Sequence, residues 1–195
     1  MSSIKKYTCG PFETNCYLDG TILIDAPPGS FDEIDYPITH ILLTHSHWDH
    51  TADCAKFKKH NPELIIVCHE NDKGNVEVPG SDGLPLFMNV EGVTPDLFIK
   101  EGDVYEGFQV IDLPGHTPGG VGFYDSKRGV LYSGDTLFQN TIGNLSFPTA
   151  RPDLMWKSLK KLAKLPPETI VLPGHGPSTT IGKESWLDHA EDFFG

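Results

Sequence analysis

Residues 38–50 read ITHILLTHSHWDH, an apolar run that passes directly into a polar cluster. The run over residues 38–44 is rich in β-branched residues and apolar at both odd and even positions, which is typical of a strand buried on both faces. The cluster HSHWDH, residues 45–50, would then lie at the carboxyl end of that strand. This junction predicts a buried sheet that carries a polar loop at its edge.

The spacing within this loop indicates metal binding. His45 and His47 are two residues apart, so both imidazoles project to one side of an extended segment. There they can reach one ion at about 2.0–2.1 Å. Asp49 and His50 are adjacent and would diverge in a strand, but a turn into a helix beginning near Thr51 would direct them to a second ion. One short loop could therefore serve two metals.

The flanking sequence predicts further strands and helices. Asp19-Gly20 is typical of a hairpin turn within residues 17–26, and residues 51–60 suit a helix that is followed by a strand over residues 64–69. Residues 71–96 are rich in Gly, Pro, Asp and Asn, as in a long loop that covers a site or binds a substrate. The apolar side chains of this loop that could face a substrate are Leu84, Leu86, Phe87 and Met88.

The second half of the chain alternates in the same way. Strands are predicted over residues 108–113, 120–124, 130–133 and 169–172. An amphipathic helix is predicted over residues 153–165 with Asp153 as its N-cap. Alternating strands and helices indicate an α/β protein.

Three single polar residues follow strand-like runs in this half. They are His116 in PGHTPGG, Asp135 in SGDTLF and His175 in PGHGP. Together with the residues of HSHWDH they form a set of histidines and carboxylates that suits zinc, with iron or manganese as alternatives. No sulfur ligand is required, and the four cysteines match neither a CxxC pair nor a zinc knuckle, so we expect them to pack in a reducing compartment.

Composition excludes several classes of function. The formal charge of the 195 residues is -12, which disfavours nucleic acid as a partner, so we expect a small-molecule substrate. No apolar stretch approaches the roughly 20 residues of a membrane span, and no signal segment is visible, which predicts a cytoplasmic protein without a membrane partner. No organic cofactor is predicted, and the oligomeric state is open.

The motifs HSHWDH, GHTPGG, SGDTLF and PGHGP, in this order and spacing, resemble the metallo-β-lactamase superfamily. The closing LPGHGPSTTIGKE is most similar to the small glyoxalase II-like, or hydroxyacylglutathione hydrolase-like, branch. The resemblance implies that residues 1–195 form a single metallo-β-lactamase-like domain, an αββα sandwich of two mixed β-sheets with helices on the outer faces. It also implies two metal ions, with one bound by His45, His47 and His116, the other by Asp49, His50 and His175, and Asp135 bridging them.

By the same resemblance, the expected function is hydrolysis of a small thioester, hydroxyacylglutathione-like, or a related acyl compound through a metal-bridging hydroxide. Two Zn²⁺ ions are expected, and the catalytic residues would be Asp49 and Asp135. Asp49 can also accept a hydrogen bond from the hydroxide and orient it. A thiolate leaving group is a weak base, so the reaction needs no strong general acid.

Two departures from the family pattern leave the substrate open. Glyoxalase II-like relatives commonly show a Gly-Arg-x-Asp stretch after the Asp135 motif, whereas this chain reads Gly143-Asn144-Leu145-Ser146. Full-length glyoxalase II enzymes also carry a C-terminal helical domain with glutathione-binding groups, and 20 residues follow His175 here.

Other activities of the superfamily remain alternatives. The strongest is a persulfide dioxygenase with one iron, and a lactonase is a further one. Histidine at position 47 counts against flavo-diiron proteins, and the acidic charge counts against a tRNA-processing nuclease. A non-catalytic role would predict lost ligands, and none of the seven is missing.

Overall fold

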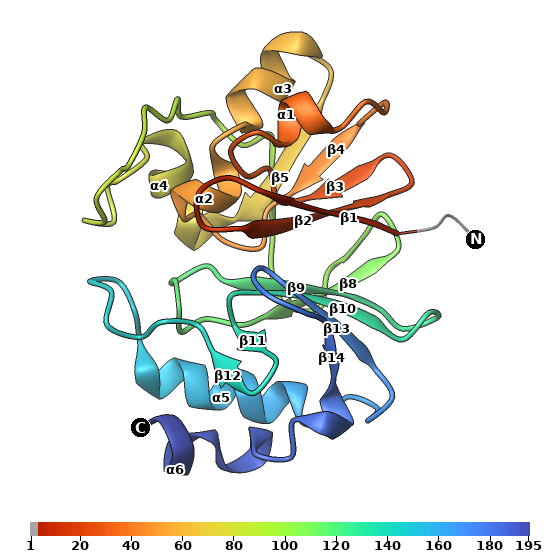
Figure 1. Cartoon of the computed structure of the whole chain (residues 1–195), viewed down its shortest axis with the longest axis vertical. Helices are drawn as coiled ribbons and strands as arrows, with labels where there is room; N and C mark the ends of the chain where they lie inside the picture. Colours follow the sequence, from red (N-terminus) through yellow and green to blue (C-terminus); the bar gives the residue numbers. More distant parts are fainter. Residues whose placement is uncertain (1–3) are drawn as a thin grey trace. The chain divides into compact units, whose positions relative to one another are not determined.

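The computed structural model describes residues 4–195. The chain forms two compact units, one that ends at Ile99 and one that begins at Lys100. Each unit contains a six-stranded mixed sheet together with helices (Figure 1). The predicted fold class, α/β with two mixed sheets and helices, is therefore confirmed, while a single domain over residues 1–195 stays a prediction.

The first unit has its six strands in sequence order across the sheet, from β1 to β6. The first three strands pair antiparallel, and β3, β4, β5 and β6 pair parallel. The strands are β1 (Lys5–Cys9), β2 (Thr14–Asp19), β3 (Ile22–Ile24), β4 (His40–Leu42), β5 (Ile65–His69) and β6 (Leu97–Ile99). The helices are α1 (Ser30–Glu33), α2 (Trp48–Thr51), α3 (Cys54–His60), the 3₁₀ turn η1 (Glu70–Asp72) and α4 (Lys73–Glu77).

The parallel pairing decides where the polar loops lie. Because β3, β4 and β5 run in the same direction, their carboxyl ends meet at one edge of the sheet. Asp25 follows β3, the HSHWDH loop follows β4, and η1 follows β5. Three polar segments that are distant in sequence are thus brought to the same edge, as expected for ligands mounted on open α/β sheets.

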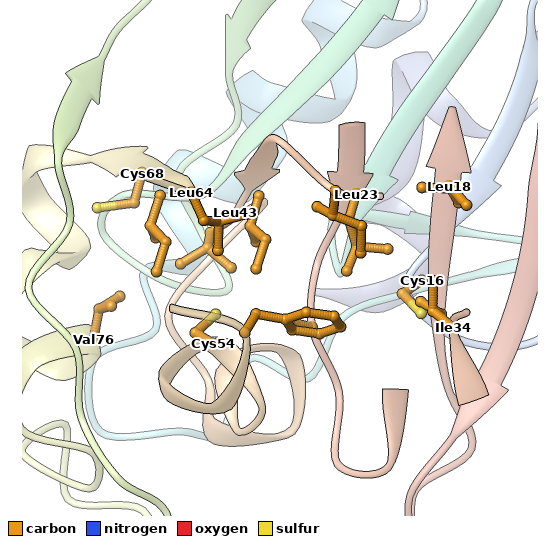
Figure 2. Packing of buried hydrophobic residues seen from close by; sticks show 14 residues of the cluster. Cys16, Leu18, Leu23, Ile34, Leu43, Cys54, Leu64, Cys68 and Val76 are labelled. Atoms are coloured by element: carbon orange, nitrogen blue, oxygen red, sulfur yellow. The ribbon is translucent and has the colours of Figure 1, made fainter. Parts of the chain in front are cut away.

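The core of the first unit lies between its sheet and its helices. Leu18, Leu23, Ile41 and Ile66 pair in a row across β2, β3, β4 and β5, so their side chains share one face of the sheet. In Figure 1, α1 and α3 lie over one face of this sheet, and all four residues belong to the buried cluster that those helices complete. Figure 2 shows Cys54 of α3 opposite the side chains of the sheet.

The second unit repeats this plan with a different strand order, β14-β13-β10-β9-β8-β7. Only β10 and β13 pair parallel. The strands are β7 (Val104–Tyr105), β8 (Phe108–Asp112), β9 (Val121–Asp125), β10 (Val130–Gly134), β13 (Ile170–Pro173) and β14 (Thr179–Thr180), with β11 (Leu137–Phe138) and β12 (Thr141–Ile142) in a separate hairpin. The helices are α5 (Pro152–Leu162), α6 (Ala190–Phe194) and the 3₁₀ turns η2 (Ile181–Lys183) and η3 (Leu187–His189).

Helix α5 covers one face of this second sheet (Figure 1). Its buried residues Met155, Leu159 and Leu162 recur at the three- and four-residue spacing of one helix face. They pack in one cluster with Leu131 and Val171, which are paired neighbours on β10 and β13. This packing holds the strand ends that carry Asp135 and His175.

Several element boundaries differ from those expected. The turn at Asp19-Gly20 and the strand over residues 64–69 are close to prediction, but the helix expected over residues 51–60 is two helices, because α2 begins at Trp48 and α3 at Cys54. Helix α5 begins at Pro152 with Arg151 as its N-cap, so Asp153 is not the cap. Proline suits the first helical position because its missing N–H has no partner there anyway. Residues 71–96 include α4 and are not entirely loop.

All four cysteines are buried thiols, as a packing role predicts. Burial raises the pKa of Cys54 well above its usual range and raises the pKa of Cys68 to about 12. Both thiols stay protonated at neutral pH and are poor nucleophiles. Over residues 4–195, none of the helices combines the length and the apolar character that a membrane crossing needs.

The packing of α5 leads to a stability prediction. Leu159→Ala should lower the free energy of unfolding by about 2–5 kcal/mol, because it removes a fully buried side chain and leaves a cavity under the helix. Lys157→Ala, on the exposed face of the same helix, should change it by less than about 0.5 kcal/mol. Urea denaturation of the metal-free proteins measures both values, and equal losses in the two variants would contradict this account of the core.

Candidate metal centre

The loop after β4 gathers three imidazoles. The ring centroids of His45 and His47 are 4.9 Å apart, and those of His45 and His50 are 4.1 Å apart. All three side chains are buried. Buried histidines are rarely packed so closely in an apolar core, because each ring nitrogen needs a partner. Such a cluster is typical of ligands that share a metal ion.

The turn into α2 brings Asp49 to the same place. His47 has an extended backbone and is the N-cap of α2, and the amide of His50 donates to the carbonyl of His47 over 2.9 Å. With this turn, Asp49 Oδ2 lies 3.5 Å from His50 Nε2. Side chains that would diverge in a strand therefore face one another, because the helix begins three residues earlier than the sequence indicates.

Asp25 anchors this loop from the neighbouring strand. Its carboxylate accepts hydrogen bonds from the Thr44 amide at 2.7 Å, from the Thr44 hydroxyl at 2.7 Å and from His50 Nδ1 at 2.8 Å. Asp25 is buried and has a positive φ of 60°, a conformation that costs free energy and often occurs at functional sites. The carboxylate fixes the proton of His50 on Nδ1, which leaves Nε2 with a lone pair directed at Asp49.

Two threonines orient the other ligands of this loop. Thr14 on β2 donates from its hydroxyl to Asp49 Oδ2 over 2.9 Å. Thr44 Oγ1 lies 3.1 Å from His45 Nδ1. Because the single hydroxyl proton of Thr44 goes to Asp25, Nδ1 of His45 must be the donor in this contact. His45, like His50, therefore has its lone pair on Nε2.

The second unit brings together the other three candidates. Asp135 and His175 follow the paired parallel strands β10 and β13, and the amide of Gly174 donates to the carbonyl of Gly134 over 2.9 Å. His175 Nε2 lies 3.4 Å from Asp135 Oδ2. His116 Nε2 lies 3.5 Å from the same oxygen. One carboxylate oxygen thus faces two imidazoles.

His116 is oriented by the backbone. Its Nδ1 lies 2.9 Å from the carbonyl oxygen of Asn144. A carbonyl can only accept, so Nδ1 carries the proton and Nε2 keeps the lone pair that faces Asp135. This approach requires Gly143, where an added Cβ would overlap the carbonyl oxygen of Asp135 and lie 3.0 Å from His116 Nδ1. Gly115 likewise allows the His116 turn to rest on the backbone of Met155 in α5.

Within each unit, these groups fit a divalent metal. The three nitrogen–oxygen separations of 3.4–3.5 Å are longer than an ordinary N–H···O hydrogen bond. They match the spacing of two ligand atoms on one tetrahedral ion, about 3.4 Å for bonds of about 2.0–2.1 Å. Histidine nitrogens and carboxylates without thiolates suit zinc, iron and manganese. The candidate ligands of the first unit are therefore His45, His47, Asp49 and His50, and those of the second unit are His116, Asp135 and His175.

Sequence reasoning missed the residues that orient the ligands. Asp25 directly follows the apolar run ILI, the same polar-after-strand signal that identified the ligands, and could have been found by it. Thr14 and Thr44 have no distinctive spacing. Asn144 acts through its backbone carbonyl, which leaves no trace in the type of side chain.

Comparison with known proteins gives consistent matches. Residues 9–175 match the family model of the metallo-β-lactamase superfamily. Hydroxyacylglutathione hydrolase GloC of Haemophilus influenzae is 36% identical over 163 residues, which cover 78% of this chain and 76% of that protein. The crystal structure of TTHA1623 in a di-iron-bound form is 36% identical, with a TM-score of 0.82 over 95% of this chain and 99% of that one.

A second solved structure covers almost the whole of both chains. The crystal structure of the B3 metallo-β-lactamase BLEG-1 is 31% identical, with a TM-score of 0.80 over 99% of this chain and 100% of that one. The family match spans most of the sequence and includes every candidate ligand. The chain therefore belongs to the metallo-β-lactamase superfamily, and it is a hydrolase of that superfamily.

Proposed function

We propose that this hydrolase uses two metal ions and cleaves a small thioester. The observation that carries the proposal is the ligand loop, where three buried imidazoles and Asp49 gather and at least two of the rings have Nδ1 fixed as the donor. In the proposed arrangement one ion is bound by His45, His47 and His116 and the other by Asp49, His50 and His175. Asp135, whose one oxygen faces two imidazoles, bridges them.

The donor set and one relative support this metal content. The seven groups are five imidazoles and two carboxylates, and this ligand set suits two zinc ions and two iron ions equally well. TTHA1623, at 36% identity, has been crystallised with two irons. We propose two Zn²⁺ ions as the resident pair, with iron as the alternative that metal analysis would detect.

The residues of the chain prepare this site for hydrolysis. When bound, the ions supply a water of lowered pKa and a Lewis acid for the substrate carbonyl. Thr14 holds one oxygen of Asp49 by a hydrogen bond, so the carboxylate keeps a fixed orientation toward a nucleophilic water. Asp25 and the Asn144 carbonyl fix the proton of His50 and of His116 on Nδ1 and orient both rings.

The surface beside the ligand loop suits an apolar acyl group. Phe12, in the turn between β1 and β2, lies 5.3 Å from Trp48 and 5.7 Å from Phe87, measured between ring centroids. Trp48 stands between the ligands His47 and Asp49 in sequence. Phe12 and Phe87 are 47% and 69% exposed, so this aromatic cluster presents open apolar area next to the ligand loop.

Hydroxyacylglutathione hydrolase GloC supports the thioester class as the first substrate to test. Zinc-loaded protein should hydrolyse glutathione thioesters faster than lactones or β-lactams, because a thiolate leaves without a general acid. A panel assay with a chelated control, paired with elemental analysis, measures rate and metal content together. One iron per chain with oxygen uptake, or no turnover beyond the chelated control, would refute the proposal.

The bridging role of Asp135 can be tested directly. Asp135→Asn should lower metal affinity and thioesterase activity by at least about 100-fold, since the loss of a ligand should exceed the 10–100-fold effect of losing a supporting group. Asp153→Asn is the matched control, because that exposed carboxylate pairs only with Arg151 among the ion pairs identified. Inductively coupled plasma analysis after dialysis gives the metal content, and full retention of two ions in Asp135→Asn would argue against bridging.

The aromatic cluster gives a second test. Phe87→Ala should raise KM for thioesters with apolar acyl groups by about 10-fold, because roughly 1–2 kcal/mol of apolar contact is lost. The value of kcat should change little, since Phe87 holds no ligand. Phe193→Ala removes a similarly exposed ring, 68% exposed, on α6 and should leave KM unchanged. A KM that does not depend on residue 87 would place the acyl group elsewhere.

A further inference from the structure

We propose that Asn75 is a positioning residue that holds the apolar segment over residues 84–88 beside the ligand loop, and that it thereby favours substrates with long apolar acyl groups. Asn75 lies in the short helix α4, outside every motif that identifies the ligands, and is buried. The inference rests on the acyl site of the proposed function, which is the aromatic cluster of Phe12, Trp48 and Phe87. It adds the residue that keeps this cluster in place.

The carboxamide of Asn75 makes hydrogen bonds with two separate parts of the chain. On one side, Nδ2 donates to the carbonyl of Ser46 in the HSHWDH loop over 2.8 Å. On the other side, Nδ2 donates to Asp82 Oδ2 over 2.9 Å, and Oδ1 accepts from the amide of Gly80 over 3.0 Å. The amide group has two N–H donors and one acceptor oxygen, so all of its polar groups are used. One buried side chain thus joins the ligand loop to the turn over residues 80–83.

This turn holds the start of the apolar segment. The amide of Gly83 donates to the carbonyl of Gly80 over 3.0 Å, and Asp82 Oδ1 accepts from the amide of Leu84 over 2.9 Å. Leu86 lies back over the same turn, because a Cβ added at Gly80 would be 3.4 Å from Leu86 Cγ. The two residues on either side of position 85 are therefore fixed to the turn.

Phe87 follows directly and returns the segment to the ligand loop. Its ring centroid lies 6.2 Å from that of Trp48, which is two residues beyond Ser46. The Phe87 side chain is 69% exposed, and burial stabilises a ring in proportion to the area removed from water. Its own contacts therefore hold this ring weakly. The position of the ring depends on the backbone before it, which Asn75 anchors.

A ring held in this way contacts a long acyl chain but not an acetyl group. Loss of the Asn75 side chain would release the segment, so the long chain would lose contact while the short one would not. The ligand loop keeps another support, because Asp72 accepts a hydrogen bond from the amide of Ser46 over 2.8 Å. The effect of replacing Asn75 should therefore fall on the choice of acyl group.

The experiment measures the binding of two product acids, acetate and hexanoate, to Co²⁺-loaded protein by changes in visible absorption. Asn75→Ala should lower the preference for hexanoate over acetate by about 3–10-fold, since one or two hydrogen bonds that hold Phe87 in place are lost. Asn61→Ala is the matched control. The Asn61 carboxamide also joins two backbone groups of the first unit, the carbonyl of Ile38 and the amide of Glu63. A purely structural defect would weaken both acids equally and leave the preference unchanged.

A double variant tests whether Asn75 acts through Phe87. In Phe87→Ala protein, the further change Asn75→Ala should have no effect on the preference, because the ring that Asn75 positions is already absent. Equal effects in the two backgrounds would overturn the inference, as would an unchanged preference in Asn75→Ala. Asn75→Asp serves if the alanine variant does not fold. It keeps the acceptor oxygen, loses the donor and should lower the preference to a similar extent.

These outcomes are distinct from a failure of the proposed function, because the binding of the acids needs no turnover. A wild-type chain that binds no Co²⁺ would overturn both. Protein that hydrolyses no thioester but has a preference that depends on Asn75 would overturn only the thioester activity. Thioester hydrolysis together with a preference that does not depend on Asn75 would overturn only this inference.

Discussion

The carboxylate of Asp25 is the interaction on which the ligand loop depends. Asp25 directly follows β3, is only 2% exposed, and accepts hydrogen bonds from the Thr44 amide, the Thr44 hydroxyl and His50 Nδ1. A buried carboxylate is costly unless it accepts hydrogen bonds, and a buried polar group left without its partner costs about 1–3 kcal/mol. The register between β3 and β4 is thereby linked to the orientation of the His50 imidazole. A shift of either strand would therefore also displace this ligand.

Both units deliver their ligands by the same physical rule. Parallel neighbours end at one edge, and the residue after each strand is polar, as with Asp25 after β3 and Asp135 and His175 after β10 and β13. His50 and His116 each give a proton to an oxygen on the side away from the carboxylate they face. The rigid strands fix where the ligands lie, and these oxygens fix the tautomers of the two imidazoles. The side chains therefore need little rearrangement to bind an ion.

Periodicity and motif spacing predicted the parts of the fold that depend on local sequence. The apolar run before His45, the turn at Asp19-Gly20 and the amphipathic pattern of α5 each carry their own signal. The start of α2 at Trp48 does not, because a helix of four residues is stabilised by its tertiary hydrogen bonds and not by intrinsic propensity. The sequence of residues 71–96 predicts a loop for the same reason, since the short helix α4 includes Gly74 and a buried Asn75.

The candidate site was predictable as a list of ligands and less so as a structure. The histidine and aspartate ligands can be recognised by their order in the sequence. The residues that orient them cannot, because they are threonines with no distinctive spacing and backbone carbonyls. Thr14 illustrates the difference, since a lone threonine carries no sequence signal and becomes notable only through its hydrogen bond to Asp49.

The contact between His116 and the Asn144 carbonyl has a consequence for how this enzyme can diversify. The ring is oriented by a main-chain oxygen, and the close approach requires a glycine at position 143. The residue type at position 144 still matters, because the Asn144 side-chain Oδ1 accepts a hydrogen bond from the Ser146 amide over 2.8 Å within the turn that carries this carbonyl. A substitution in this stretch can therefore change the turn and still keep the atom that orients the ligand, because that atom belongs to the main chain.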